Sequence, residues 1–339
     1  MPKPAKPRRS PDLKALGARA GAAPAELEPQ KATLVERAPE GEAWLHELKF
    51  DGYRLLASVA RRRVRLTTRN GKDWTERMPS LAGELSQLTH DVLLDGEIAV
   101  LDEAGVSDFQ RLQHALGPGS EQAIVYFVFD LLYLDGFDLR ELALERRKEL
   151  LSEVLSAQRK KRERVLYSDH VVGHGVEFHR AACERGLEGT IAKRRNDPYR
   201  SGRTQSWLKI KCFGRQEFVV VGFTEPAGSR AHFGALVLGL RQGQGWVYAG
   251  KVGTGFDDRT LAELKRLLTP LERPTPVLDN APRGAEVRGV HWVEPKLVVE
   301  VQFTTFTEDG LLRHPSFRGL RRDKAATEVV LERAKRSSR

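Results

Sequence analysis

Lys49 is the first residue of this sequence whose type and surroundings indicate chemistry. It lies in an otherwise apolar, strand-like segment, residues 44–50, which is followed by Asp51 and Gly52. A lysine partly removed from water has a lowered pKa and can act as an amine nucleophile. Many lysines at such positions only extend from a strand edge into solvent. The local sequence therefore leaves both interpretations of Lys49 open.

Acidic side chains accompany two other strand-like segments. Asp95 and Glu97 are expected at the end or turn of a buried strand, and Glu188 and Lys193 form an acid and base pair across another short strand. Either pair alone is equally typical of a surface salt bridge. Carboxylates from two places are also what a divalent cation requires.

The segment 207–211 alternates between apolar and basic residues, which places Lys209 and Lys211 on one face of a strand. Two lysines on one face repel each other unless an anion lies between them, and a triphosphate would serve. Together with Lys49 and the carboxylates, they complete the set of groups needed for nucleotidyl transfer.

Short aliphatic runs predict the strands that position these residues. In the first part of the chain they cover residues 55–59, 64–68, 92–101 and 124–134. A helix is expected at about residues 139–156, with Leu150 and Val154 on its buried face and Arg147 and Lys148 on its polar face.

A second group of strands predicts a second domain. It comprises residues 218–223, 233–240, 246–252 and 297–303, with one amphipathic helix at about 257–268. Short strands around one helix indicate a small closed barrel of the oligonucleotide-binding kind. We therefore expect a flexible basic tail or linker over residues 1–28, a first domain over 29–213 and the barrel over 214–339.

The charge of the chain is compatible with a polyanionic partner. Lys plus Arg number 56 and Asp plus Glu number 46, a formal net charge of +10 over 339 residues. The basic run at residues 159–162 is either solvated surface or a DNA contact. Composition alone decides neither whether the chain binds a polyanion nor whether this basic run contacts DNA.

The number of cysteines and the lengths of the apolar stretches exclude several classes of protein. Cys183 and Cys212 are the only cysteines, too few for a four-thiolate zinc site or a disulfide framework, and we expect two reduced thiols. No apolar stretch approaches the ~20 residues that span a bilayer. A signal-peptide core is also missing from the N-terminus, so we expect no membrane contact and a cytoplasmic, nucleoid-associated protein.

In their order along the chain, these segments resemble the covalent nucleotidyltransferases, specifically the ATP-dependent DNA ligases. The signature Lys-x-Asp-Gly stands at residues 49–52, so Asp51 and Gly52 are implied to bind nucleotide with Lys49. Further family motifs match residues 68–71, 95–97, 126–132, 188–193, 207–211 and 321–324. The resemblance implies an α+β fold: a two-domain arrangement of a nucleotidyltransferase domain, with antiparallel sheets and flanking helices, followed by an OB-fold β-barrel.

Three segments of the second domain, residues 218–224, 250–256 and 313–317, resemble the ligase component of bacterial ligase D. That family implies double-strand break repair by end joining, with Ku or other end-joining proteins as partners. The glycines of residues 250–256 lack the Gly-Lys-Ser/Thr ending of a phosphate-binding loop. We expect a strand that runs into a turn before a helix.

The resemblance implies three transfers on nicked duplex DNA by a monomeric enzyme. Lys49 attacks the α-phosphate of ATP and becomes covalently linked to AMP, the AMP passes to the 5′-phosphate of a nick, and the 3′-hydroxyl then displaces AMP. For the nucleotide, Glu47 is implied to read the adenine edge and Phe129 to stack on the base. Arg54 and Arg69 are implied to contact ribose, nucleotide phosphate or nick phosphate.

The charged motifs receive phosphate and metal roles in the same way. Glu97 and Glu188 are implied to hold Mg²⁺ or Mn²⁺. Lys193, Lys209 and Lys211 are implied to neutralise the α-phosphate. Nearby cations should also lower the pKa of the nucleophilic lysine, because like charges disfavour its charged form.

Arg321, Asp323 and Lys324 are implied to swing in on the barrel, orient pyrophosphate, and then turn away so that the barrel can grip DNA. This predicts a domain rotation hinged near residues 211–216. Thr190 and Arg322 depart from the family pattern, where an aliphatic and an acidic residue are usual. Neither position carries the implied chemistry, so we expect altered packing or tuning there.

Three other classes remain as alternatives. RNA ligases and capping guanylyltransferases share the lysine motif, but Glu47 and the ligase D-like second domain favour ATP and DNA. An NAD-dependent ligase would carry a four-cysteine zinc site, which this sequence lacks. A binding protein that has lost its activity would not be expected to retain every charged motif.

Overall fold

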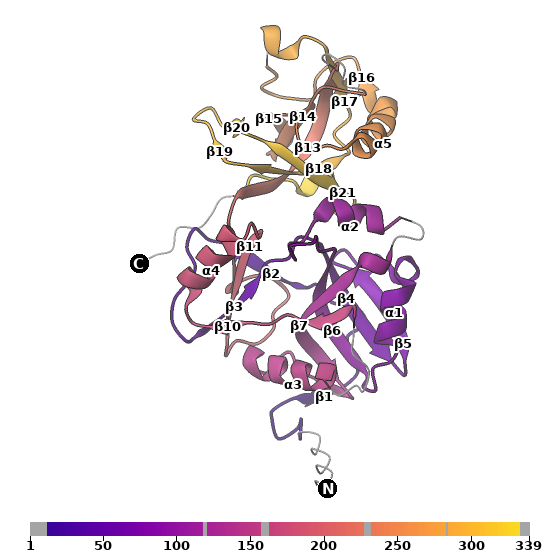
Figure 1. The fold of residues 1–339 in the computed structure, drawn as a ribbon, viewed down its shortest axis with the longest axis vertical. Coiled ribbons are helices and arrows are strands. Elements are labelled where there is room, and N and C mark those ends of the chain that lie inside the picture. Colours follow the sequence, from indigo (N-terminus) through magenta and orange to yellow (C-terminus); the bar gives the residue numbers. More distant parts are fainter. Residues whose placement is uncertain (1–11, 118–120, 157–162, 227–231, 283, 333–339) are drawn as a thin grey trace.

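The computed structural model describes residues 12–117, 121–156, 163–226, 232–282 and 284–332. It has two domains, one above the other in Figure 1, with strand β12 (Gly202–Lys211) in the lower and β13 (Gly214–Thr224) leading into the upper. Their hydrophobic cores are separate: the lower domain's cores extend as far as Ile210, and the upper core starts at Phe218.

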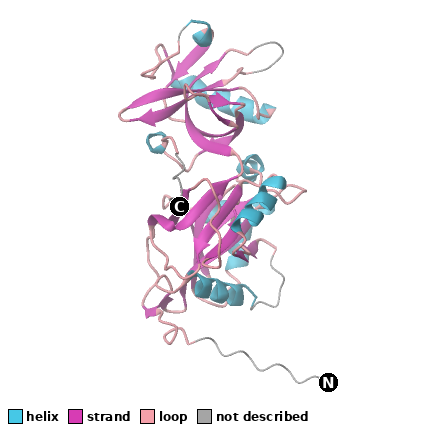
Figure 2. Ribbon diagram, turned by 90° about the vertical axis from the view of Figure 1, so that its left-hand side faces the viewer, coloured by secondary structure: helices cyan, strands magenta, loops and turns pink. Residues whose placement is uncertain are grey.

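The first domain contains two sheets. In the larger sheet the strands lie in the order β1 (Arg19–Ala20), β8 (Phe137–Asp138), β7 (Val125–Leu134), β6 (Val92–Ala99), β4 (Tyr53–Ala60) and β5 (Arg63–Thr68), with β9 (Val165–Tyr167) parallel to β7. Helices α1 (Pro79–Leu85), α2 (Phe109–Ala115) and α3 (Leu144–Ser156) contribute side chains to the core on one face of this sheet. Figure 2 shows these helices lying against the strands.

The smaller sheet has the order β10 (Val171–Val172), β3 (Trp44–Leu48), β11 (Gly189–Arg194), β12 and β2 (Gln30–Leu34), and helix α4 (Gly175–Glu184) packs on β3 and β11. Side chains alternate across a strand, so β4 turns Leu55 into the main core and Leu56 the other way. Leu56 meets Phe129 and Trp207 in a cluster that joins the two sheets.

The second domain is built around the long strand β13, which pairs antiparallel with β14 (Leu236–Gln242), β17 (Val290–Val293) and β18 (Val298–Phe303). Around these lie β15 (Gly245–Val252), β16 (Glu272–Arg273), β21 (Ser316–Arg321), the hairpin of β19 (Thr305–Phe306) and β20 (Leu312–Arg313), and helix α5 (Asp258–Leu268). Asp257 caps α5 by accepting a hydrogen bond from the Thr260 amide at 2.7 Å.

Several sequence predictions about elements are confirmed. The helix at 257–268 is α5, and residues 250–256 form the end of a strand and a turn before it. The two-domain α+β architecture is present as expected. The described part of the barrel has more strands than the four or five expected. β16, β19 and β20 are only two residues long and leave no periodic pattern, and β17 and β21 were not predicted either.

Other predictions need correction. Of the expected tail, residues 12–28 lie on the first domain: Leu13 and Ala18 are buried in its core, and β1 pairs with β8. The polar face predicted for α3 is wrong at Arg147 and Lys148, which are buried because each meets a carboxylate inside the domain. The basic run at 159–162 lies outside the described residues.

The expectation of two reduced thiols is also wrong. Cys183 at the end of α4 and Cys212 after β12 form a disulfide. Helix α4 packs on β11, and β11 pairs with β12, so the fold brings two cysteines 29 residues apart to a Cα–Cα distance of 5.1 Å. Among the described residues, no helix has both the length and the apolar character needed to cross a membrane.

Candidate active site

A cavity of about 400 Å³ opens between the two sheets of the first domain and the barrel. Every residue that the sequence analysis assigned to a site lines it: Glu47, Lys49, Asp51, Gly52, Arg54, Arg69, Glu97, Phe129, Glu188, Lys193, Lys209, Lys211, Arg321, Asp323 and Lys324. Residues more than 270 positions apart in the sequence thus meet around one space.

Lys49 directly follows β3, and its backbone amide donates to Gly189 of the neighbouring β11 at 3.0 Å. Its Nζ lies 2.5 Å from Glu188 Oε1. Burial alone would lower the pKa of Lys49, but the Glu188, Asp51 and Glu300 carboxylates outweigh it, and the pKa is raised. The prediction that neighbouring cations keep this amine neutral is therefore wrong, because carboxylates are its nearest neighbours.

Glu97 and Glu188 are the two carboxylates that the sequence analysis expected to hold a divalent cation. Glu188 Oε2 is buried and has no hydrogen-bond partner. Burial raises the pKa of Glu97 to about 7, although Arg54 and Lys49 oppose the shift. Glu97 lies within β6 and not at its end as predicted, since the strand continues to Ala99. An orphaned buried oxygen beside a second carboxylate fits a divalent cation.

Glu47 has a buried carboxylate that two lysines hold in place. Its Oε1 lies 2.7 Å from Lys148 Nζ and its Oε2 lies 2.8 Å from Lys193 Nζ. Burial would raise the pKa of Glu47, yet these two cations lower it below its ordinary value. Burial lowers the pKa of Lys193 to about 8. Lys193 is therefore engaged on the Glu47 side of the cavity.

Phe129 lies on β7 among cations and a second aromatic ring. The Arg54 guanidinium is 4.4 Å and Lys193 Nζ is 4.3 Å from the centre of its ring, and the Trp207 ring meets it edge-on at 5.9 Å. Arg54 is held by both oxygens of Asp95 at 2.5 Å, and Tyr199 donates to the same carboxylate at 2.6 Å. This end of the cavity is aromatic and rigidly hydrogen-bonded.

Lys209 and Lys211 share one face of β12, as the alternation predicted, and an anion does lie between them. The carboxylate of Glu332 accepts from Lys209 Nζ at 2.8 and 3.0 Å and from Lys211 Nζ at 3.0 Å. Burial and Lys211 lower the pKa of Lys209 to about 8. Against the effect of burial, the two lysines hold the pKa of Glu332 well below its ordinary value.

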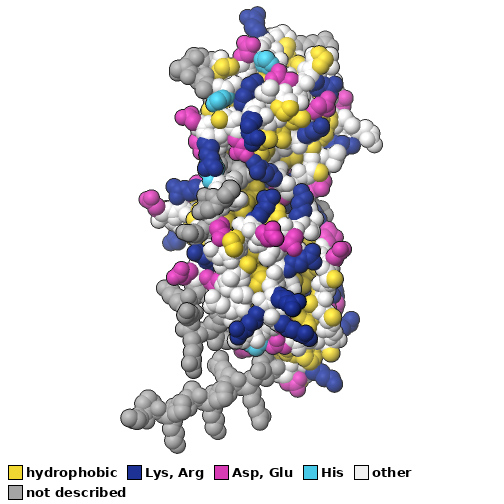
Figure 3. Space-filling model, turned by 90° about the vertical axis from the view of Figure 1, so that its right-hand side faces the viewer, with side chains coloured by type: hydrophobic (Ala, Val, Ile, Leu, Met, Phe, Trp, Pro, Cys, Tyr) yellow, Lys and Arg dark blue, Asp and Glu magenta, His cyan; other side chains and the backbone are white. Residues whose placement is uncertain are grey.

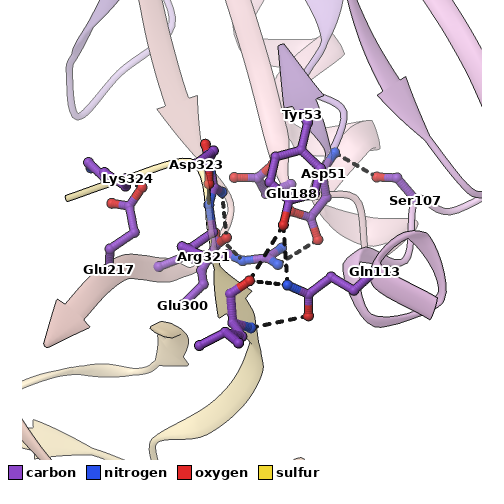
Figure 4. Close-up of polar contacts among 12 residues, drawn as sticks. Asp51, Tyr53, Ser107, Gln113, Glu188, Glu217, Glu300, Arg321, Asp323 and Lys324 are labelled. Atoms are coloured by element: carbon purple, nitrogen blue, oxygen red, sulfur yellow. Dashed lines mark hydrogen bonds and ion pairs between the residues drawn. The ribbon is translucent and has the colours of Figure 1, made fainter. Parts of the chain in front are cut away.

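The barrel supplies the opposite wall of the cavity (Figure 4). Arg321 ends β21, donates to both oxygens of Asp323 at 2.9 and 2.8 Å, and reaches Glu300 at 2.9 Å. Lys324 Nζ lies 3.0 Å from Glu217. On the first domain, Asn70 Nδ2 donates to the Asp323 carbonyl. This contact holds the motif at residues 321–324 against the motif at residues 68–71.

Asp51 and Gly52 connect the nucleophile to both walls. The Asp51 carboxylate lies 2.5 Å from Arg215 of β13, and its backbone amide donates to Ser107 Oγ at 2.9 Å. Burial raises the pKa of Asp51 to about 7, although Arg215 opposes it. A Cβ at Gly52 would overlap the Ile98 carbonyl, which explains the glycine of the signature.

Sequence reasoning missed several residues of this site. Lys148 was assigned to a solvated face, and no pattern marked Arg215, Glu300, Glu217 or Glu332. Their common signal is charge inside otherwise apolar strands or beside a buried partner of opposite charge, which becomes visible only when the pairing of strands is known.

The arrangement provides an amine nucleophile, two carboxylates suited to a divalent cation, same-face lysines, an aromatic end and a second cationic wall. These groups can bind a nucleoside triphosphate and stabilise charge at one of its phosphates.

Comparison with known proteins agrees with this chemistry. Residues 28–211 match the family model described as ATP dependent DNA ligase domain, and residues 229–324 match the ATP dependent DNA ligase C terminal region. The chain is 44% identical over 314 residues to the multifunctional non-homologous end joining protein LigD of Pseudomonas aeruginosa, covering 91% of this chain and 37% of that protein. LigD of Mycobacterium tuberculosis is 38% identical over 292 residues, which cover 85% of this chain and 37% of the relative.

This chain therefore spans little more than a third of the length of these relatives. Two solved structures are also similar, each covering 90% of this chain and 98% of the solved chain. A mycobacterial DNA ligase D complexed with ATP and MES is 36% identical with a TM-score of 0.71, and the ligase domain of M. tuberculosis LigD is 37% identical with a TM-score of 0.51. At nearly equal identity and coverage, the backbone arrangement of this chain is closer to that of the ATP complex.

Proposed function

The chain belongs to the ATP-dependent DNA ligase family, and from this premise we propose that it seals nicks with a 3′-hydroxyl and a 5′-phosphate through an AMP-linked Lys49. The observation that carries the proposal is the convergence on one cavity of residues from every matched motif. The unit made of residues 29–213 would carry out adenylation, and residues 214–339 would form the mobile barrel.

In the first step the Lys49 amine attacks the α-phosphate and pyrophosphate leaves. Lys209 and Lys211 lie on the same side of the cavity as Lys49 and would neutralise the phosphate oxygens where charge develops. Asp323 orients Arg321 through two hydrogen bonds, so the guanidinium and Lys324 would direct pyrophosphate in line with the departing bond.

Glu97 and Glu188 would hold Mg²⁺ or Mn²⁺, which would supply further charge neutralisation at the phosphates. The orphaned Glu188 Oε2 supports this assignment. Glu188 is now the partner of Lys49 at 2.5 Å. If the Glu188 carboxylate engaged a cation, it would no longer raise the pKa of Lys49, and a larger share of the amine would be neutral and nucleophilic.

The aromatic end of the cavity suits the base. Phe129 would stack on adenine, with Arg54 and Arg69 toward the ribose and phosphates. Both oxygens of Glu47 are bound to lysines. Glu47 would therefore read the adenine edge only by sharing an oxygen with Lys148 or Lys193, which keep its carboxylate ionised and fixed in position.

For the later steps the barrel must turn away, because Arg321, Asp323 and Lys324 occupy the side from which DNA would approach Lys49. The likeness to the ATP complex supports the assignment of this arrangement to the adenylation step. Lys and Arg side chains lie along both domains and at their junction in Figure 3, a surface suited to the backbone of nicked duplex DNA.

The cellular role proposed is double-strand break repair in the bacterial cytoplasm, in association with the nucleoid and with the enzyme acting as a monomer. The relatives that support it are named as non-homologous end joining proteins and are much longer than this chain. Ku or another end-binding protein would bring the enzyme to its break.

A labelling and chase experiment tests the proposal. The protein is incubated with α-labelled ATP and Mg²⁺ or Mn²⁺, freed of nucleotide, and mixed with nicked DNA or a nicked RNA duplex. Label should transfer from protein to the DNA nick and then appear as AMP as the nick closes. Labelling by GTP in preference to ATP, or transfer to RNA alone, would favour a capping enzyme or an RNA ligase instead.

A further inference from the structure

Helix α2 touches the barrel through two amide side chains that no motif includes. Gln110 Nε2 donates to the Gly255 carbonyl at 2.8 Å, and Gln113 binds the backbone next to Arg321. Gln113 Nε2 donates to the Leu320 carbonyl, and the Leu320 amide donates to Gln113 Oε1 at 3.1 Å (Figure 4). Gln113 Nε2 also lies 3.2 Å from the Tyr53 hydroxyl. Leu320 directly precedes Arg321 in the chain.

The two hydrogen bonds to Leu320 imitate the pairing of a strand. Strand β21 pairs with β18, and its other edge faces α2. A glutamine amide carries one acceptor and a donor group, like a peptide unit, so it can satisfy both backbone groups of an edge residue. When the barrel turns away, water can replace the glutamine at little cost, which makes the contact reversible.

The residues around this contact pack closely when the barrel covers the cavity, which we call the closed arrangement. A Cβ on Gly319 would overlap the ring of Phe109 and approach Gln113 Oε1 to 2.9 Å. The Arg321 guanidinium lies 5.0 Å from the centre of the Phe109 ring and 5.4 Å from that of Tyr53. Helix α2 thus contacts the backbone just before Arg321 as well as its side chain.

We propose that Gln113 is a positioning residue: by binding the Leu320 backbone it holds Arg321 and Asp323 over Lys49 for self-adenylation and releases them for the DNA steps. This rests on the proposed ligase function. Gln113 touches no reacting atom, and its effect should be confined to the step that uses the closed arrangement.

Separate half-reactions test the role of Gln113. Gln113→Ala should slow single-turnover labelling by α-labelled ATP about 10-fold, because two hydrogen bonds at the interface are lost, and should change sealing of a pre-adenylated nick less than about twofold. Gly319→Ala should give the same split by steric means. Gln244→Ala removes the same amide from an exposed turn of the barrel and should label and seal like the wild type.

Thermal melting of each variant checks that the fold is kept. Equal slowing of both half-reactions by Gln113→Ala, or no slowing of labelling in a folded variant, would overturn the proposal. Because wild-type labelling and sealing are measured in the same experiment, failure of this inference is distinguishable from failure of the ligase function.

A second, independent observation concerns Glu332. Residues 329–332 are attached to the barrel: Val329 is buried in its core, and the Glu332 amide donates to Gln216 Oε1 at 3.0 Å. The Glu332 side chain is only 22% exposed and makes hydrogen bonds to Lys209 and Lys211 inside the nucleotide cavity. An acidic group placed between two phosphate-binding lysines has the charge of a phosphate oxygen.

We infer that Glu332 takes the place of a triphosphate oxygen and competes with ATP for Lys209 and Lys211. This too rests on the proposed function. ATP must displace the carboxylate before it can use both lysines, so Glu332 lowers the affinity of the enzyme for ATP while neutralising the charge of the two lysines.

The test is the ATP concentration dependence of self-adenylation. Glu332→Gln should lower the KM for ATP about 5- to 10-fold, with a maximal rate within about twofold of the wild type. Glu308→Gln makes the same charge change at an exposed turn of the barrel and should leave KM unchanged. An unchanged or raised KM in Glu332→Gln would overturn the inference, the latter by showing that Glu332 assists ATP binding.

Discussion

The two walls of the cavity are built in different ways. The first-domain wall is fixed by paired strands and buried ion pairs, such as Glu47 with Lys148 and Arg147 with Asp130. The barrel wall is fixed internally and reaches the first domain through side chains: the Arg215–Asp51 ion pair, Glu332 between Lys209 and Lys211, and amides that bind its backbone, as Gln113 does at Leu320 and Asn70 at Asp323. Such side-chain contacts can exchange partners more easily than paired strands, so in the proposed mechanism the first wall is permanent and the second is detachable, since only one step of the reaction needs both.

The most severe test of the permanent wall is Lys49→Ala. Without the amine no phosphoramidate can form, and labelling by α-labelled ATP should fall at least about 1000-fold. The same variant should still seal a pre-adenylated nick, which bypasses the nucleophile. Retained labelling would show that another residue is the nucleophile.

Lys209→Ala tests whether a residue of the first-domain wall is needed in every step of the reaction. Lys209 lies on β12 in the first domain and would contact phosphate in every step. We expect labelling and sealing of a pre-adenylated nick both to fall about 10- to 100-fold, with Lys14→Ala as an exposed lysine control. A loss confined to labelling would place Lys209 functionally with the barrel wall.

Glu97→Gln tests whether the buried Glu97 carboxylate destabilises the fold when it is ionised and no cation is bound to it. Burial raises the pKa of Glu97 from 4.5 to about 7, so the folded protein keeps this proton while the unfolded chain loses it. Wild-type stability should therefore fall as pH rises from about 4.5 to 7, and at pH 8 in EDTA Glu97→Gln should be more stable by about 1 kcal/mol, a discounted value because the side chain is partly exposed.

The gain should vanish below about pH 4, where the glutamate is protonated in both states. Thermal melting across this pH range measures it. Lower stability of Glu97→Gln than of the wild type at pH 8 would contradict the assignment, and added Mg²⁺ should stabilise the wild type more than the variant.

The smallest effect on catalysis is expected from the disulfide. Cys183 and Cys212 do not line the cavity, so Cys183→Ser with Cys212→Ser should change either half-reaction less than about twofold. Without reductant the double variant should lose about 2–4 kcal/mol of stability, measured by denaturant unfolding. A selective loss of self-adenylation would show that the disulfide supports the closed arrangement.

The difference between the walls also explains what the sequence could predict. Lys49, Lys209 and Lys211 were found because alternation and strand ends assign a face to each residue. Arg321 and Asp323 were assigned to the same site only through the family motif, since no local pattern relates them to Lys49.

The missed residues depend on tertiary pairing. Lys148 reads as part of a polar helix face until Glu47 is known to lie beneath it, and Gln113 and Glu332 are ordinary surface residues in the sequence. The pKa of Lys49 was predicted in the wrong direction for the same reason. Its nearest charge, Glu188, lies 139 positions away and comes close only because β11 pairs with β3.

In the proposed mechanism the barrel wall is needed for the adenylation of Lys49 but not for the later transfer of AMP to the nick or for sealing. Asp323→Ala tests this most directly, with single-turnover labelling by α-labelled ATP measured beside sealing of a pre-adenylated nick. Labelling should fall about 10- to 100-fold while sealing stays within about threefold of the wild type. An equal loss in both half-reactions would contradict it.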